Sequence, residues 1–244
     1  MNRALAAGAS GMAAQQAVLD TIAANLSNLD TPGFRIDRPE FAALVDQNGR
    51  TSIAVAQAPT RLFTPGKLET TNNPFDLAID GEGLFEVRNP SGVLAYTRAG
   101  NFTPDAMGRL RLPGGAALAN VRLPSGALGV EFGVDGRIRA RIAGRADAID
   151  IGRVALCAFA NNPALRFGSD GLFYATRASG NVFRGSPGSG GFGELKQRAL
   201  ERANVNVVGA MMAVLAAQRA YEANAKSVQA ADEMLRLANN LERG

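Results

Sequence analysis

Few side chains in this sequence have the types and spacing that catalysis requires. The chain of 244 residues contains no His, which excludes Ser-His-Asp and Cys-His catalysis, His-metal sites and His-based pH sensing. Its one cysteine, Cys157, excludes an internal disulfide and a cysteine-cluster metal site. Because Cys157 lies in the apolar run from Val154 to Phe159, we expect it to be a small buried hydrophobic residue.

Acidic side chains offer the remaining chemistry. Asp76, Asp80 and Glu82 are close enough in sequence to hold Ca²⁺, but their spacing does not match an EF-hand loop, and acids at such positions commonly stabilise turns. Glu222 and Glu233 have no partner acid in a recognisable cleft. We therefore predict no catalytic residue, no metal site and no cofactor, and we expect that the protein is not an enzyme.

Two other features could suggest a phosphate or nucleic-acid ligand, but neither of them supports one. The glycine-rich segment 185–191 lacks the Gly-Lys-Ser/Thr ending of a phosphate-binding loop and contains Pro187, so its composition favours a flexible linker. The net charge of +4 comes mostly from arginines spread along the chain, without interleaved aromatic residues. We predict no nucleic-acid binding.

The strongest pattern is an apolar residue at every seventh position, and it occurs at both ends of the chain. Near the start, the interface positions are Leu5, Met12, Leu19 and Leu26, with Ile22 and Leu29 on a companion line three residues on. Near the end they are Val207, Val214, Tyr221, Val228 and Leu235, with Ala210, Ala217, Asn224 and Ala231 on the companion line. A stripe this narrow cannot bury itself, so we predict two terminal helices that pair as a coiled coil and pack with further copies. Either stripe taken alone would also suit an ordinary amphipathic helix on a globular core.

Two polar members of the stripes need a role. Tyr221 could act as a catalytic acid, but its place on the apolar line favours packing. Asn224 interrupts the line of small residues, and a buried polar residue at such a position fixes the register of a helix pair at a cost in stability. We therefore expect Asn224 to set register, with a solvent-facing position at a subunit boundary as the alternative.

The first helix carries its own start and stop signals. Gly8 and Gly11 weaken its first turns by about 1 kcal/mol each relative to Ala. Its strong part should therefore run from Met12 to Leu29. Pro32 then ends it, because proline cannot continue a helix and pushes Thr31 towards extended geometry.

Short strands and turns fill the middle of the chain. Phe41, Leu44 and Val45 could extend a short helical turn, residues 47–50 read as a turn, and residues 51–58 read as a strand. Residues 75–79 and 84–87 suggest a hairpin through the Asp-Gly and Glu-Gly pairs between them. The alternation in 137–142 predicts a half-buried strand with three arginines on its wet side.

The predicted fold class is α+β, with terminal helices as an inner coiled-coil layer and a central antiparallel all-β domain. The predicted divisions are an N-terminal helix (1–34), a connecting segment (35–71), the β domain (72–184), a Gly/Ser-rich linker and return (185–197) and a C-terminal helix (198–244). The sequence contains no apolar run of about eighteen residues, so we predict no membrane span. The first residues after Arg3 lack the apolar density of a secretory signal, so we expect no cleavable signal peptide.

Several motifs resemble one known family. The N-terminal motif is 25–35, NLSNLDTPGFR, and the C-terminal motifs are 200–208, LERANVNVV, and 218–226, QRAYEANAK. Between them, 76–85, DLAIDGEGLF, and 96–102, YTRAGNF, follow in the same order. Together they resemble the bacterial flagellar rod and hook proteins, and within that family they are most similar to distal rod members. The resemblance covers nearly the whole chain.

That resemblance implies properties that spacing alone does not. Such proteins are axial structural components of the flagellar basal body, exported unfolded through the flagellum's own type III apparatus. Their termini form an inner coiled-coil layer, and their β domains form the outer layer of a rod that crosses the periplasm and transmits torque from motor to hook. The implied partners are further copies of the chain, other rod proteins, the hook and the surrounding ring proteins.

Two departures keep alternatives open. The segment between Phe34 and Pro74 is shorter than in typical distal rod proteins, so a proximal-rod or hook-type axial role stays open. Residues 209–212, GAMM, replace a more acidic run and remove candidate salt bridges between subunits. From another class, the chain could be a β-domain binding module on a helical dimerisation stalk, and a basic nucleic-acid binder is the third option.

Overall fold

The computed structural model of the chain describes residues 3–45, 51–145 and 147–241, which form two compact units. The first unit comprises Met1–Asn28, Ile36–Leu62 and Val205–Gly244, and the second comprises Leu29–Arg35 and Phe63–Asn204. Its elements in chain order are α1 (Arg3–Ser27), β1 (Asp37–Val45), β2 (Thr51–Arg61), β3 (Leu68–Thr70), β4 (Leu77–Asp80), β5 (Leu84–Arg88), β6 (Leu94–Thr97), β7 (Thr103–Pro104), β8 (Leu110–Arg111), β9 (Ala117–Leu118), β10 (Ala127–Phe132), β11 (Arg137–Ile142), β12 (Ile149–Arg153), β13 (Leu156–Phe159), the 3₁₀ helix η1 (Asn162–Ala164), β14 (Arg166–Phe167), β15 (Phe173–Tyr174), β16 (Val182–Gly185), β17 (Glu194–Gln197), β18 (Ala199–Glu201) and α2 (Val207–Leu241). The predicted α+β class is confirmed.

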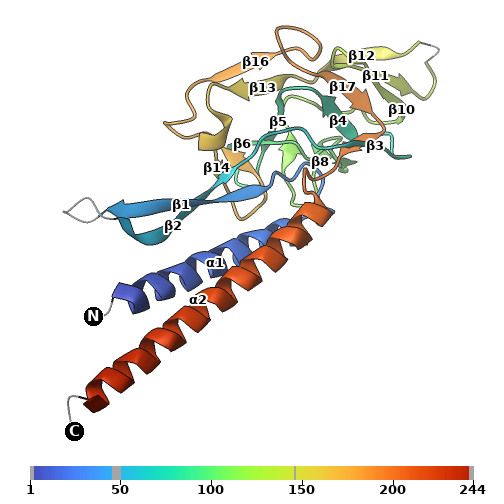
Figure 1. Cartoon of the computed structure of the whole chain (residues 1–244). Coiled ribbons are helices and arrows are strands. Elements are labelled where there is room, and N and C mark those ends of the chain that lie inside the picture. Colours follow the sequence, from blue (N-terminus) through green and yellow to red (C-terminus); the bar gives the residue numbers. More distant parts are fainter. Residues whose placement is uncertain (1–2, 46–50, 146, 242–244) are drawn as a thin grey trace. The chain divides into compact units, whose positions relative to one another are not determined.

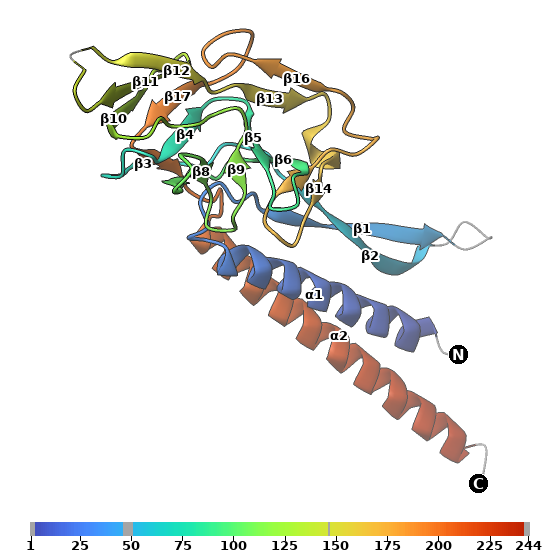
Figure 2. The same cartoon turned by 180° about the vertical axis from the view of Figure 1, so that it is seen from behind.

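The first unit joins the two chain ends. Helices α1 and α2 run side by side, as Figure 1 and Figure 2 show from opposite sides, and they pack against each other. α1 runs from Arg3 to Ser27, so it includes the turns that contain Gly8 and Gly11 and ends two residues before the predicted end at Leu29. Neither helix has an apolar stretch long enough to cross a bilayer, judged over the residues described here.

The same unit contains a long antiparallel hairpin, β1–β2, against which α1 also packs. The prediction of a helical turn at Phe41, Leu44 and Val45 is wrong, because these residues belong to β1 and pair with Ala56, Ile53 and Thr51 of β2. Pairing with β2 runs from Asp37 to Val45 and gives these residues a ladder of backbone hydrogen bonds, whereas a single helical turn closes few such bonds. The strand predicted at 51–58 is confirmed, and the predicted turn at 47–50 lies outside the described residues.

The second unit is the antiparallel β structure. Its largest sheet has the order β14-β15-β6-β5-β9-β8-β7, with β13 and β16 attached through β5, and β10-β11-β12 form a further sheet. A contiguous apolar core includes Leu77, Phe85, Phe102, Leu110 and Ile138, all fully buried. The prediction for β11 is confirmed, since its arginines are exposed and the alternate residues Ile138 and Ala140 are buried.

The predicted hairpin through residues 75–87 is wrong. β4 pairs with β17, with Ile79 opposite Leu195, whereas β5 pairs with β6, β9 and β13. The reason lies in the intervening segment, whose carbonyl groups at Ile79, Gly81 and Gly83 all accept hydrogen bonds from the Arg98 guanidinium. These bonds hold the segment around Arg98, and the strands on its two sides pair with separate partners.

The glycine-rich segment 185–191 lies inside the second unit, between β16 and β17. Its turns are closed by backbone hydrogen bonds, including one from the Gly188 N–H to the Gly193 carbonyl. β17 and β18 follow, paired with β4 and β3, before α2 begins.

Candidate assembly site

The predicted interface residues of the two helices are only partly covered in the single chain. Ile22, Ala217 and Ala231 are buried, at 8, 3 and 3 % exposure. Leu26 and Tyr221 are exposed, and the side chain of Leu235 lies outside the described set. The other predicted positions are half-buried: Leu5, Met12, Leu19, Leu29, Val207, Ala210, Val214, Asn224 and Val228.

Two glycines set the close approach of the helices. A Cβ atom at Gly8 would lie 2.4 Å from Val228 Cγ2, and one at Gly11 would lie 2.7 Å from Asn224 Nδ2. Contacts below 3.0 Å force a neighbour to move, so only glycine fits here without adjustment. Sequence reasoning counted Gly8 and Gly11 as a weakness of α1, and it missed that they are the packing surface for α2. The available signal was the position of Gly8, which stands two heptads before Ile22 on the companion line, whereas Gly11 lies on neither line.

Asn224 lies in this contact. Its amide faces Gly11 and is half-buried, and within the described part of the chain its side chain has no hydrogen-bond partner. A polar group that is half-withdrawn from water and lacks a partner favours an arrangement that supplies one.

A second apolar stripe, which the seven-residue line does not contain, runs along the first turns of α2. Val208, Met211, Met212 and Leu215 are 72, 57, 64 and 52 % exposed. Their spacing of three, four and seven residues places them on one face of the helix. Exposed apolar patches of this kind mark interaction surfaces. The sequence already contains this apolar spacing, and Met211 and Met212 belong to the segment 209–212 that lacks acidic residues.

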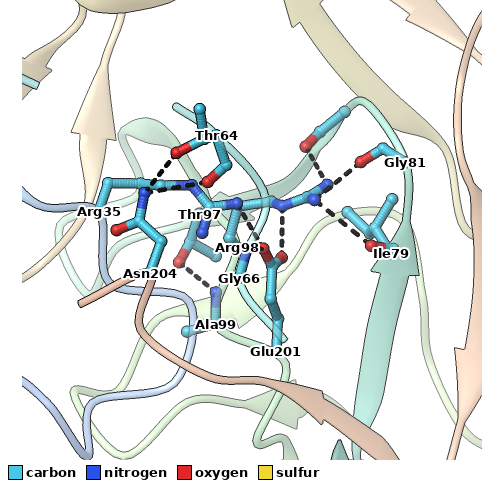
Figure 3. Close-up of polar contacts among 11 residues, drawn as sticks. Arg35, Thr64, Gly66, Ile79, Gly81, Thr97, Arg98, Ala99, Glu201 and Asn204 are labelled. Carbon is cyan, nitrogen blue, oxygen red and sulfur yellow. Dashed lines mark hydrogen bonds and ion pairs between the residues drawn. The ribbon is translucent and has the colours of Figure 1, made fainter. Parts of the chain in front are cut away.

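Three of the family motifs meet in the second unit at a buried charge cluster, shown in Figure 3. The Arg35 Nη2 group donates to Glu201 Oε1 at 2.7 Å, and the Arg98 Nε group donates to Glu201 Oε2 at 2.7 Å. The side chains of Arg35, Arg98 and Glu201 are 1, 3 and 1 % exposed. The Gly66 N–H also donates to Glu201 Oε1, at 2.6 Å. One carboxylate thus binds two cations and a backbone amide.

The remaining N–H groups of Arg98 are satisfied by backbone. Its two terminal nitrogens donate to the carbonyl groups of Ile79, Gly81 and Gly83. Burial lowers the pKa of the Arg98 guanidinium, and the Glu201 carboxylate opposes that shift. Buried ion pairs stabilise a fold weakly in net terms, but removal of one partner leaves an uncompensated charge.

Backbone contacts bring the same motifs together. Gly33 adopts φ of +69°, and a Cβ atom there would lie 2.4 Å from the backbone carbon of Arg98. The Gly33 N–H donates to the Glu201 carbonyl at 2.7 Å. Glycine is therefore required in the 25–35 motif for two reasons, its left-handed conformation and the close approach of the strand end. We call Arg35, Arg98 and Glu201, with Gly33 and Gly66, the motif junction.

Sequence reasoning used these motifs for the resemblance and assigned no role to their charged residues. Arg35 and Glu201 are 166 positions apart, and Arg98 and Glu201 are 103 positions apart, so no local pattern links them. Composition alone does not single them out, because 25–35 also contains Asp30 and 200–208 also contains Arg202.

Two of the acids considered for metal binding, Asp76 and Asp80, have structural partners. Asp76 is buried and accepts hydrogen bonds from the Thr71 hydroxyl and the Asn73 amide, each at 2.8 Å. Asp80 lies 3.9 Å from the Lys196 ammonium. Over the residues described, no group of three or more Asp, Glu or Cys side chains is placed to hold a metal ion.

Cys157 is fully buried, as predicted, but it is not only a hydrophobic residue. Its thiol donates to Glu86 Oε2 at 3.4 Å, and the same oxygen accepts from Arg184 Nε at 2.7 Å. Burial first, and the neighbouring Glu86 carboxylate second, raise the pKa of the thiol to about 12. A thiol that stays protonated is a poor nucleophile, so this cluster has a structural role.

Comparison with known proteins places all of these motifs in one family. Three family descriptions match successive parts of the chain: "Flagella basal body rod protein" over residues 5–35, "Flagellar hook protein FlgE/F/G D1 domain" over 78–140, and "Flagellar basal body rod FlgEFG protein C-terminal" over 196–241. The motif junction takes one charged residue from each of these three regions.

Full-length relatives agree. The chain is 37 % identical to the flagellar basal-body rod protein FlgG of Borreliella burgdorferi, with 100 % of both chains covered. It is 34 % identical to FlgG of Caulobacter vibrioides over 98 % of this chain and 99 % of that protein. It is also 31 % identical to the rod protein FlgF of Escherichia coli over 93 % of this chain and 92 % of that one. The chain belongs to the flagellar basal-body rod protein family, which is a family of structural proteins and not of enzymes.

Proposed function

We propose that the chain is an axial subunit of the distal flagellar rod, in which α1 and α2 pair as a coiled coil and pack with copies of themselves as the inner layer. The observation that carries this proposal is the apolar surface of α2. Val208, Met211, Met212 and Leu215 are exposed in the single chain, and the predicted stripe beside them is mostly half-buried. Neighbouring copies would cover both surfaces.

The distal position rests on similarity over the full length to FlgG proteins. A proximal-rod or hook-type position is the second candidate, because the chain also aligns along most of its length with an FlgF protein. The partners would be copies of the chain, other rod proteins, the hook and the ring proteins around the rod. The site of action would be the rod across the periplasm.

Asn224 supports a defined register in this arrangement. Its amide faces Gly11, and Val228 one turn on faces Gly8, so two large residues of α2 match two glycines of α1. A shift of one turn would place a side chain where only glycine fits. We assign Asn224 the register role, with its free hydrogen-bonding capacity directed to a neighbouring copy.

The motif junction would transmit load. The chain enters the β unit from α1 through the segment that contains Arg35 and leaves it towards α2 from the strand that ends at Glu201. Both segments are fixed to Arg98 or to each other by ion pairs. Load that reaches either segment would therefore act on this buried cluster of ion pairs.

Electron microscopy of concentrated protein tests the proposal. The unaltered chain should form rods or tubes, and Leu215→Asp should remain a monomer with a folded β unit, because a charge on the exposed stripe cannot be buried between copies. Val93→Asp is the matched control, since Val93 is also 52 % exposed but lies in a turn of the β unit. Assembly of Leu215→Asp into normal rods, or equal loss of assembly in both variants, would refute the role of the stripe.

A further inference from the structure

A small cavity lies beside the motif junction in the second unit. It is lined by Arg35, Phe63, Glu82, Leu84 and Asn162, together with Gly83 and Arg98. The space offers about 10 Å³ to the centre of a water-sized sphere. Roughly 10–15 Å³ on this measure is the least that holds one water molecule. The cavity is therefore sized for a single small ligand.

Arg35, which lines the cavity, has hydrogen-bond donors without an acceptor in the part of the chain that the structure describes. Arg35 uses Nη2 to bind Glu201, but its Nε and Nη1 groups are buried and have no protein acceptor among the described residues. The side chain is only 1 % exposed, so bulk water does not reach these groups. Buried N–H groups without a partner cost about 1–3 kcal/mol, and more on a charged group.

Asn162, which also lines the cavity, has a hydrogen-bond acceptor without a donor among the residues described. The Oδ1 atom of Asn162, at the start of η1, is buried and likewise has no donor within the described part of the chain. Arg35 and Asn162 do not bond each other directly, although both line the cavity. Both residues line the same cavity, and each keeps a buried hydrogen-bonding group that has no protein partner among the described residues.

The chemistry of the lining selects the ligand. A metal cation is disfavoured by the guanidinium groups of Arg35 and Arg98, and an anion is disfavoured by the Asn162 oxygen and the nearby Glu82 and Glu201 carboxylates. The ligand must accept from Arg35 and donate to Asn162, and it must be no larger than water. We propose that this cavity is a binding site for one structural water molecule, which bridges the Arg35 guanidinium to Asn162 Oδ1.

This bridge would extend the junction. It would connect the segment that contains Arg35 to η1, which the Thr176–Ser179 turn holds through a hydrogen bond from the Thr176 hydroxyl to the Ala164 carbonyl, at 2.7 Å. Arg35 would then be fixed on both sides of its guanidinium, by Glu201 directly and by Asn162 through water. The inference does not depend on the proposed position in the rod.

A crystal structure of the full chain at a resolution that shows ordered water is the direct test. We expect a density peak about 2.7–3.2 Å from Asn162 Oδ1 and from Arg35 Nε or Nη1. A direct Arg35–Asn162 hydrogen bond, or no peak in the cavity, would overturn the proposal.

Thermal unfolding of variants gives a second, independent measurement. Asn162→Leu removes the acceptor and fills the cavity, so its Tm should fall by at least about 2 °C below that of Asn181→Leu. Asn181 is the matched control, because it is exposed and its side chain has no hydrogen bond among the described residues. Asn162→Asp keeps an oxygen acceptor and should retain the Tm of the unaltered chain. Equal Tm values for the two Leu variants would count against the bridge.

Discussion

At the scale of single residues, Glu201 is the residue on which the motif junction depends most. Its carboxylate accepts from Arg35, from Arg98 and from the Gly66 N–H, and these groups come from different stretches of the chain. The two guanidiniums are almost fully removed from water, and this one carboxylate is their shared counter-ion. The loss of its charge would leave both cations uncompensated in the interior.

Glu201→Gln should therefore lower the free energy of unfolding of the β unit by about 3–5 kcal/mol. Urea unfolding followed by a signal from the β structure measures this change. Glu69→Gln is the control, since Glu69 pairs with Arg202 at the surface and both side chains are about half exposed. A surface pair contributes little because water and salt screen it. Equal losses in the two variants would show that the junction is not a special attachment point.

Cys157 gives a second prediction at this scale. Because burial and Glu86 raise the pKa of its thiol to about 12, from an ordinary value of 9.0, the folded protein should react very slowly with iodoacetamide at about pH 8. The same chain in denaturing urea should react at the rate of a free thiol. A raised folded pKa also means that the thiol contributes stability below about pH 9, and that this contribution is lost as the pH rises towards 12. Rapid alkylation of the folded chain would contradict the buried placement.

At the scale of elements, the sequence predicted what local periodicity controls. The seven-residue spacing of Leu5, Met12 and Leu19 gave α1, and the alternation of Arg137 to Ile142 gave β11. Both patterns follow from the geometry of one element on one buried face. The strand predicted at 51–58 is confirmed as part of β2, whereas α1 runs from Arg3 to Ser27 and not from Met12 to Leu29.

Elements whose partners lie far away in sequence were missed or misread. β4 pairs with β17 across more than a hundred residues, so the neighbouring turn glycines suggested the wrong hairpin. The junction of Arg35, Arg98 and Glu201 depends on the same long-range pairing. Gly8 and Gly11 looked unfavourable because helix propensity is local, whereas their benefit appears only when α2 is in place.

The packing role of Gly8 leads to a prediction that opposes helix propensity. Gly8→Ala should favour the isolated helix by about 1 kcal/mol, yet it should impair assembly, because the new Cβ atom meets Val228. Rod formation seen by electron microscopy is the measurement, and Gly8→Ala with Val228→Ala should restore it. Gly209→Ala is the control, since a Cβ atom there makes only an ordinary contact, 3.5 Å from Asn206. Normal rods from Gly8→Ala alone would refute close α1–α2 packing.

At the scale of the whole molecule, we expect the β unit to be more stable than the two helices. The β unit has a closed apolar core with Phe85, Phe102 and Leu110 fully buried. The buried apolar side chains among the described residues of the helices are Ala14, Ile22, Ala217 and Ala231, and α2 exposes the stripe of Val208, Met211, Met212 and Leu215. Helices with so little burial are stabilised mainly by packing, so the chain should be only partly ordered until copies assemble.

Amide hydrogen exchange, measured on the monomer and on assembled rods, tests this central claim most directly. In the monomer, the β unit should be strongly protected, whereas α2 should exchange quickly along most of its length. In rods, protection of α2 should rise to the level of the β unit, and Leu215→Asp, which cannot assemble, should keep the monomer pattern. Strong protection from Val207 to Leu235 in the monomer would contradict the account, because the helices would then be stable without neighbouring copies.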